Sequence, residues 1–121
     1  MRTQEVIIFV RRGAEVLAVH RSPENGGYWH SIAGGVEDGE TYAQAAVREL
    51  HEETGLVAEV EPLEHTFDYD GIRVESFVVD TPAGWEPTLD WEHDEYRWLP
   101  REEAAELLFW PEPAALLRSL P

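Results

Sequence analysis

The stretch GGVEDGETYAQAAVRELHEETGL, residues 34–56, contains the clearest helix signal in the chain. Thr41 and Gln44 have the spacing of a capping box, in which each side chain bonds the backbone N–H of the other residue. Gly55 stands where a residue in the left-handed conformation commonly ends a helix. We therefore predict a helix over 41–54. Its predicted buried stripe consists of Ala43, Ala46, Val47 and Leu50.

Three acidic residues lie on one face of this predicted helix. Glu49, Glu52 and Glu53 have the spacing of neighbours on a helical surface. Glu49 and Glu53 repel one another at a cost of roughly 0.2–0.5 kcal/mol, close to the negative end of the helix dipole. A solvated acidic face explains the helix alone, but a divalent cation would also stabilise this arrangement. Oxygen ligands in a chain without cysteine favour Mg²⁺ or Mn²⁺ over zinc.

The whole stretch resembles the Nudix box, G-x5-E-x7-R-E-U-x-E-E-x-G-U, in which U is an aliphatic residue. Every defined position is filled without insertion or deletion, in order by Gly34, Glu40, Arg48, Glu49, Leu50, Glu52, Glu53, Gly55 and Leu56. The resemblance implies an α/β (α+β) fold, with a mixed β-sheet sandwiched between α-helices. It also implies a single Nudix hydrolase domain over residues 1–121, with the box at 34–56.

The same resemblance implies a role in metal binding for several of these residues. Glu52 and Glu53 correspond to the principal metal ligands of the family. Glu49 corresponds to a further ligand or to the general base. The backbone carbonyl of Gly34 is another expected ligand, because a glycine lets the backbone approach a metal–phosphate assembly closely.

The resemblance also implies that the loop before the helix is held in place by charge. Arg48, which we count among the catalytic residues, corresponds to an arginine that pairs with a carboxylate of this loop. We expect that carboxylate to be Glu37. Glu40 is expected to give structural support to the loop and helix.

A carboxylate far from the box completes the metal site or acts as a base in many Nudix enzymes. Glu92, six residues before Trp98, is the best match and is predicted to be both a catalytic residue and a metal ligand. Asp94 and Glu95 are alternatives, and Glu95 fits an acidic surface loop equally well. Which of Glu49, Glu92, Asp94 and Glu95 is the general base stays open, as does the number of metal ions.

Two further segments, 28–37 and 92–99, resemble bacterial dihydroneopterin triphosphate pyrophosphatases, which also act on dATP. The implied substrate is a nucleoside or pterin triphosphate, cleaved to a monophosphate and pyrophosphate. The alternatives are a dinucleoside polyphosphate or ADP-ribose hydrolase, and a non-enzymatic nucleotide-sensing domain. Aromatic side chains stack on bases, so the expected substrate-binding residues are Trp29, His30, Phe67 and Tyr69.

Outside the box, apolar and β-branched runs alternate with turn residues. This pattern predicts strands over 5–10, 16–20, 57–60, 72–79 and 96–99. It also predicts a helix from about residue 100 to 109 and, after an interruption at Pro111, a second helix over 112–120.

The composition limits the possible partners and location of the chain. The formal net charge is −16 and all nine basic residues are arginine, so we expect a small phosphate compound rather than a nucleic-acid polymer. The absence of cysteine excludes disulfides and thiol nucleophiles, and it fits a cytoplasmic protein. The apolar run 6–10 is too short to span a membrane. The sequence leaves open whether the chain forms a homodimer.

Overall fold

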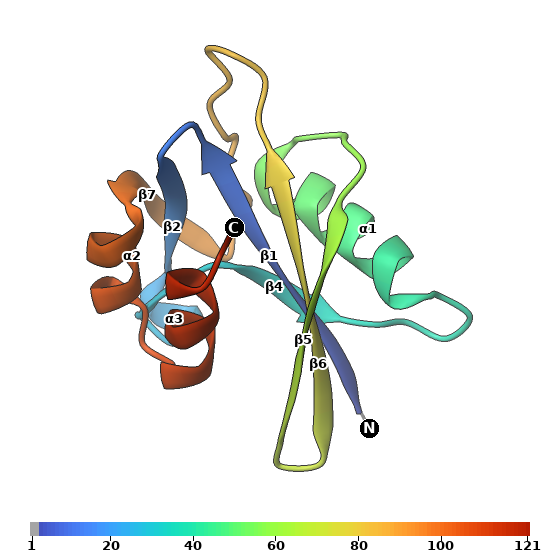
Figure 1. Ribbon diagram of the computed structural model, residues 1–121. Coiled ribbons are helices and arrows are strands. Elements are labelled where there is room, and N and C mark those ends of the chain that lie inside the picture. Colours follow the sequence, from blue (N-terminus) through green and yellow to red (C-terminus); the bar gives the residue numbers. More distant parts are fainter. Residues whose placement is uncertain (1–2) are drawn as a thin grey trace.

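The structure is a computed structural model that describes residues 3–121, so the first two residues of the predicted domain lie outside the described residues. Figure 1 shows strands and helices mixed along the chain. In chain order they are β1 (Gln4–Arg12), β2 (Glu15–Arg21), a short 3₁₀ turn (Pro23–Asn25), β3 (Trp29–His30), β4 (Ile32–Gly35), α1 (Tyr42–Thr54), β5 (Glu61–Tyr69), β6 (Ile72–Asp80), β7 (His93–Pro100), α2 (Arg101–Leu107) and α3 (Pro111–Arg118).

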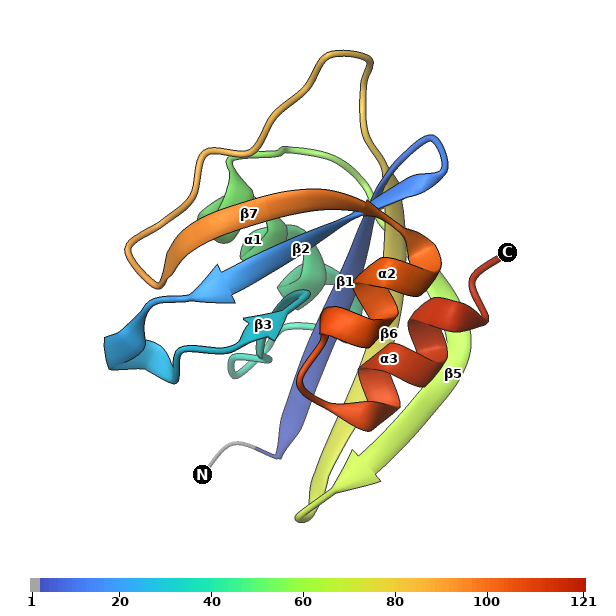
Figure 2. The same ribbon diagram turned by 90° about the vertical axis from the view of Figure 1, so that its left-hand side faces the viewer.

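The seven strands form one mixed sheet around β1. The main strand order is β3-β2-β1-β6-β5, while β4 pairs with β1 and β7 pairs with β2. β1 and β6 are parallel, and the other pairs are antiparallel. Figure 2 shows α2 and α3 in front of the sheet and α1 behind it. The predicted sheet sandwiched between helices is therefore confirmed.

β1 is central because its side chains are buried on both faces. Val6, Ile8 and Val10 pack into the core on the α1 side, whereas Ile7 and Phe9 pack against α2 and α3. None of the five is more than 2% exposed. A strand covered on both faces needs a continuous apolar run rather than an alternating one, and the run 6–10 has this composition.

Helix α1 has the predicted caps, with a buried face rotated from the predicted one. The reciprocal capping box is present, and Gly55 ends the helix at φ 82°. Ala43 is exposed and Val47 only half-buried, while Ala45 is fully buried. Beyond Ala46 and Leu50, which are buried as predicted, the face continues to Glu53 and Thr54. Apolar periodicity missed this rotation because it assigns a glutamate to the solvent side.

Two segments differ from the predicted strands. The predicted strand 57–60 is wrong, since this stretch is irregular and Val57 is 76% exposed. The strand begins instead at Glu61, where β5 forms the edge of the sheet and pairs only with β6. On β5 only Leu63 and Phe67 are half-buried, so its sequence carries little of the β-branched signal that the prediction used.

The remaining differences concern short elements and boundaries. The short strands β3 and β4 were not predicted, and β7 begins three residues before the predicted start at residue 96. The two predicted C-terminal helices are present as α2 and α3, but the break lies at residues 108–110 and Pro111 is the first residue of α3. Proline suits this position because the N–H it lacks would have no partner inside the helix.

The loop between β6 and β7 is held in place near its middle by hydrogen bonds to the side chain of Glu86. Glu86 accepts hydrogen bonds from Arg12 Nη1 (2.6 Å), Trp98 Nε1 (2.9 Å) and Tyr96 Oη (3.1 Å). Further along, the N–H of Thr88 donates to the carbonyl of Thr54 at 2.8 Å. The loop is therefore attached both to the sheet and to the C-terminal end of α1.

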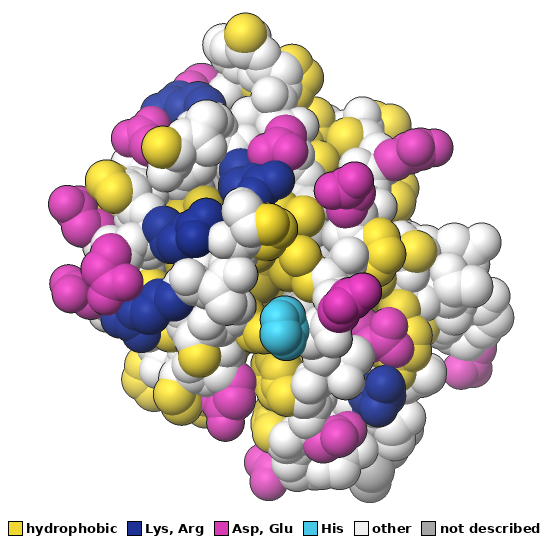
Figure 3. All heavy atoms as spheres, in the orientation of Figure 1, with side chains coloured by type: hydrophobic (Ala, Val, Ile, Leu, Met, Phe, Trp, Pro, Cys, Tyr) yellow, Lys and Arg dark blue, Asp and Glu magenta, His cyan; other side chains and the backbone are white. Residues whose placement is uncertain are grey.

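The surface agrees with the acidic composition. On the face seen in Figure 3, acidic side chains are spread widely, whereas most arginines lie on the side of α2 and α3. None of the helices within residues 3–121 is long and apolar enough to cross a membrane.

Candidate active site

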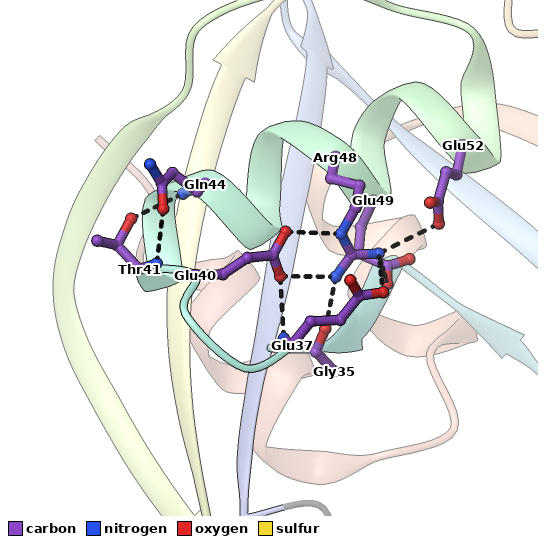
Figure 4. A network of polar contacts seen from close by, with 8 residues as sticks. All are labelled: Gly35, Glu37, Glu40, Thr41, Gln44, Arg48, Glu49 and Glu52. Carbon is purple, nitrogen blue, oxygen red and sulfur yellow. Dashed lines mark hydrogen bonds and ion pairs between the residues drawn. The ribbon is translucent and has the colours of Figure 1, made fainter.

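Arg48 joins α1 to the loop before it (Figure 4). Its Nε and Nη2 donate to the two carboxylate oxygens of Glu40 at 2.7 and 2.9 Å, and Nη2 also donates to the carbonyl of Gly35. The expected partner, Glu37, makes a longer contact, with Oε1 3.6 Å from Arg48 Nη1, and its side chain is 68% exposed. Glu40 is therefore the principal partner, which corrects the prediction.

The turn before α1 explains this choice of partner. Glu40 also accepts a hydrogen bond from the backbone N–H of Glu37 at 2.9 Å, which folds the turn and directs the Glu40 carboxylate toward Arg48. The hydrogen bond from Arg48 is the largest cause that lowers the pKa of Glu40 to about 2. Glu40 thus gives the structural support expected of it. It does so by pairing with Arg48, the role that was predicted for Glu37.

The same guanidinium also reaches the acidic face of α1. Arg48 Nη1 donates to Glu49 Oε1 at 2.9 Å and to Glu52 Oε2 at 3.3 Å (Figure 4). The Glu52 side chain is 54% exposed, whereas that of Glu49 is only 14% exposed. One arginine therefore partly neutralises two of the three predicted metal-binding carboxylates and orients them.

Glu53 lies in a different environment from its neighbour Glu52. It is only 3% exposed, and its Oε2 has no hydrogen-bond partner within the described part of the chain. Burial is the largest cause that raises the pKa of Glu53 well above 4.5, followed by its hydrogen bond and charge interaction with Glu49. The charges of Asp90 and Glu92 act in the same direction. A buried carboxylate facing other carboxylates requires a proton or a cation.

These carboxylates fit a hard cation that keeps part of its own hydration shell. All the available side-chain donors are oxygens, and Glu53 Oε2 is a buried oxygen without a partner. Within residues 3–121, no three acidic or histidine side chains form a ready-made metal cage. Mg²⁺ suits an open arrangement, because it usually binds one or two carboxylates together with water and substrate phosphates.

Gly34 lies directly against the Glu49 carboxylate. A Cβ atom at Gly34 would lie 2.1 Å from Glu49 Cδ and 2.3 Å from Oε1. Gly34 pairs with Val6 of β1, whose side chain packs into the core on the α1 side, so the open space faces α1. Only a glycine leaves room for the carboxylate at this position.

The structure separates the three acids proposed from the β7 region. Asp94 lies 2.8 Å from His20 Nδ1, and Glu95 accepts from Arg97 at 3.1 Å, so both are paired elsewhere. Glu92 also has an ion-pair partner, since its Oε2 lies 3.6 Å from Arg21 Nη2, but it is the acid among the three whose charge acts on Glu53. This charge interaction favours Glu92 over its two alternatives, while its role in metal binding or proton transfer stays a prediction.

Two residues beside Glu53 were not among the predicted site residues. The His93 side chain is 1% exposed, with Nδ1 2.8 Å from Asp90 Oδ1 and Nε2 3.5 Å from Glu53 Oε1. The spacing of His93 from the other histidines and acids matches no metal-ligand pattern. Its place directly after Glu92 was the only signal that linked it to the site.

Gly34 also lines a cavity of about 500 Å³. His30, Phe67 and Tyr69 line it, as expected of substrate-binding residues. Trp29 does not line it and instead packs edge-on against His20, with the Arg97 guanidinium over its ring. Sequence analysis missed other lining residues, among them Arg21, Tyr28 and Trp110.

His30 is one of the polar residues that line this cavity. Burial is the main cause that lowers the pKa of His30 to about 4, so the ring is neutral at pH 7. Its Nδ1 has no hydrogen-bond partner in the part of the chain that the structure describes. Buried polar atoms are usually paired with a protein group, an ordered water or a ligand, so this nitrogen is a candidate for a contact with a bound molecule.

Comparison with known proteins places these features in a wider group. The NUDIX domain family model matches residues 1–120. A curated octanoyltransferase from Myxococcus xanthus is 38% identical over 118 residues, which cover 89% of this chain and 33% of the relative. An NAD-capped RNA hydrolase from Pasteurella multocida is 47% identical over 51 residues, 42% of this chain and 19% of the relative. The chain thus spans a third or less of the length of these two relatives.

Among solved structures, a dihydroneopterin triphosphate pyrophosphohydrolase from E. coli has the same fold. It superposes with a TM-score of 0.85 at 21% identity, covering 97% of this chain and 93% of that one.

Proposed function

The chain belongs to the Nudix domain family of hydrolases, and from this premise we propose that it cleaves a nucleoside or pterin triphosphate into a monophosphate and pyrophosphate. The observation that carries the proposal is the position of Gly34, which lines the cavity and also lies against the Glu49 carboxylate. An aromatic ring system held in the cavity would direct its phosphate chain toward the acids of α1.

The carboxylates of α1 fit the divalent cation that the family uses. Glu49, Glu52 and Glu53, with Glu92 from the loop, would hold Mg²⁺ or Mn²⁺. Such an ion neutralises the phosphates and lowers the pKa of a bound water when it is present. Arg48 holds two of these carboxylates in place. Glu49 or Glu92 accepts the proton of the attacking water.

The cavity fits a small aromatic compound with few negative charges outside the phosphate chain. Its walls include Tyr28, Phe67 and Trp110, and base–aromatic stacking contributes about 1–3 kcal/mol per base. Neutral His30 offers one hydrogen bond to the ring system. Arg21 is the only basic residue among the described lining residues besides His30. Together with the net charge of −16, this favours a small molecule over a nucleic-acid polymer.

A second candidate substrate is a compound with two nucleosides joined through phosphates, or an ADP-sugar. The 47% identity with an NAD-capped RNA hydrolase favours it, since NAD contains such a diphosphate linkage. The matched segment is short, however, and the octanoyltransferase relative extends far beyond this chain. Neither relative's activity is therefore assigned to this chain.

A screen of purified protein with Mg²⁺ or Mn²⁺ tests the proposal directly. It compares nucleoside triphosphates, dihydroneopterin triphosphate, dinucleoside polyphosphates and ADP-ribose. We expect a monophosphate and pyrophosphate from a triphosphate, and no turnover in excess EDTA. Orthophosphate with a diphosphate would indicate a different cleavage position. Turnover of ADP-ribose or dinucleoside polyphosphates without any of triphosphates would favour the second candidate.

A pair of tryptophan variants tests the cavity as the binding site. Trp110→Ala removes a cavity wall and should raise KM about 5- to 150-fold, the equivalent of one stacking contact. Trp29→Ala is the matched control, because Trp29 lies outside the cavity. An equal rise in KM for both variants, or for neither, would contradict this assignment. Melting temperatures of both variants separate binding from packing.

A further inference from the structure

We propose that His93 is a positioning residue that holds Glu53 so that one carboxylate oxygen faces the histidine and the other faces the phosphate site. This inference rests on the proposed function, since it assigns Glu53 to the cation site. His93 itself touches neither the cation nor the substrate in this role. It acts through Glu53, and Asp90 in turn fixes the orientation of the histidine ring.

The first step of the argument is the orientation of the ring. Asp90 Oδ1 lies 2.8 Å from His93 Nδ1. This contact determines which edge of the ring points inward. The opposite edge, with Nε2, faces Glu53. The ring cannot turn freely, because the His93 side chain is 1% exposed.

The second step is the difference between the two oxygens of Glu53. Oε1 lies 3.5 Å from His93 Nε2, whereas Oε2 has no hydrogen-bond partner within residues 3–121. The buried carboxylate is thus asymmetric, with one oxygen facing the histidine and one oxygen left over. A cation held by the carboxylates of the proposed function would supply the partner that this buried oxygen lacks.

The third step is the attachment of the histidine to the rest of the fold. The N–H of His93 donates to the carbonyl of Asp90 at 3.3 Å, which closes a tight turn. The carbonyl of Glu92 accepts from the N–H of Ser22 at 2.9 Å. His93 also pairs with Arg21 at the start of β7. Backbone contacts on both sides therefore fix the histidine against the end of α1.

Removing such an outer contact weakens metal binding typically by 10- to 100-fold. Two substitutions separate the two edges of the ring. The amide of His93→Asn can replace Nδ1 toward Asp90 but does not reach Glu53. The longer amide of His93→Gln can replace Nε2 toward Glu53. We expect Mn²⁺ affinity, measured by the EPR signal of free Mn²⁺ without substrate, to fall about 10- to 100-fold in His93→Asn and to be largely retained in His93→Gln.

A second histidine–aspartate pair provides the matched control. His20 Nδ1 lies 2.8 Å from Asp94 Oδ1, the same distance as in the His93–Asp90 pair, but on the surface. His20→Asn should leave Mn²⁺ affinity unchanged. Melting temperatures identify any variant that fails to fold, and Asp90→Asn then serves as the second test, with an expected loss of affinity between those of the two His93 variants.

The outcomes separate this inference from the proposed function. Unchanged Mn²⁺ affinity in His93→Asn, or equal losses in His93→Asn and His93→Gln, would overturn the positioning role and leave the hydrolase proposal intact. Loss of affinity in His93→Asn alone supports the role, even if wild-type protein cleaves no triphosphate and the proposed substrate is wrong. A wild-type protein that binds no Mn²⁺ would overturn both.

Discussion

The candidate site is built from two segments that differ in how they position their side chains. Segment 34–56 brings its carboxylates together through helical spacing, a capped start and a glycine end. The segment 88–93 has no regular spacing, and backbone hydrogen bonds to Thr54 and Ser22 bring it to the site. Helical spacing therefore places the acids on one face of α1, whereas tertiary contacts determine which of them is buried.

Glu52 and Glu53 show what the second segment adds. They are adjacent in the sequence, yet Glu52 is exposed and contacts Arg48, whereas Glu53 is buried beside Asp90 and His93. The helix places both carboxylates near its C-terminal end, on the side that also contains Glu49. The loop places His93 against Glu53, and the charges of Asp90 and Glu92 add to burial and to Glu49 of the same helix in raising the pKa of Glu53. The comparison predicts that changes on α1 remove activity, and that changes in the loop reduce it.

The largest expected effect comes from the α1 carboxylates. Glu53→Gln and Glu52→Gln keep the side-chain shape but remove the charge, so kcat should fall at least ~10²-fold in each. Neither variant should unfold, and Glu53→Gln should melt higher than wild type in EDTA because it removes a buried ionisable group. Steady-state kinetics and thermal melts measure both effects. Wild-type turnover in either variant would contradict the metal-binding role of that residue.

Gly34→Ala should reduce activity almost as strongly without changing the charge. The new methyl group would displace the Glu49 carboxylate, and misplacement by about 1 Å costs on the order of 10²-fold in rate. The clash involves the end of a flexible side chain, so the melting temperature should change little. A large drop in melting temperature with normal kcat would show that Gly34 is needed for folding rather than for the site.

A smaller effect is expected for the loop acids. Glu92→Gln should lower kcat about 10-fold or more, within the range of general acid–base or charge contributions. Asp94→Asn is the control, since Asp94 is paired with His20 away from Glu53. Its kcat and stability should match wild type, because surface substitutions usually change stability by less than about 0.5 kcal/mol. Loss of activity in Asp94→Asn with normal activity in Glu92→Gln would reverse the assignment.

The link between the loop and α1 should matter mainly for stability. Arg48→Ala and Glu40→Gln each break the paired hydrogen bonds and should cost about 1–2 kcal/mol, less than a fully buried charged pair because solvent screens them. Glu37→Gln should cost less than about 0.5 kcal/mol. Urea unfolding measures all three. A larger loss in Glu37→Gln than in Glu40→Gln would restore the original partner. Arg48→Ala should also lose activity.

The smallest expected effect is a pH dependence in metal-free protein. Native Glu53 holds its proton above pH 4.5, whereas the unfolded chain releases it there, so this residue's contribution to stability declines as pH rises above 4.5. Glu40 behaves oppositely: its contribution is present above pH 4.5 and is lost as pH falls toward about 2. In EDTA, stability at rising pH should decline less in Glu53→Gln than in wild type. Identical pH profiles would contradict a protonated native Glu53.

Much of the fold could be predicted because its signals are local. The capping box, the glycine after α1 and the apolar run of β1 each act within a few residues, and all three have the predicted form. The edge strand β5 could not be predicted, because a strand exposed on most of its surface needs few apolar residues. The β-branched Val57 and Val60 led to the wrong prediction of a strand over 57–60, because β propensity depends on the surroundings of a segment.

The site was predictable to the extent that it follows the motif. The chemistry of Glu49, Glu52 and Glu53 was expected from spacing and family resemblance, although not the burial of Glu53. The choice of Glu40 over Glu37 depends on a turn whose backbone hydrogen bond is invisible in the sequence. Likewise, His93 reaches Glu53 only after β7 pairs with β2. Such choices between similar side chains depend on tertiary geometry.

The attachment of Glu86 to Arg12, Tyr96 and Trp98 has a consequence for how this loop can vary in length. It divides the connection between β6 and β7 into two spans that close independently. Extra residues at 82–85 would lengthen only the span between the end of β6 and Glu86. The entropy cost of closing a loop grows slowly with its length. An insertion at 87–91 would instead lengthen the chain between Glu86 and the backbone contacts of Thr88 and Glu92, and it would displace Asp90. The same loop can therefore accommodate insertions before Glu86 but has little tolerance for them after it.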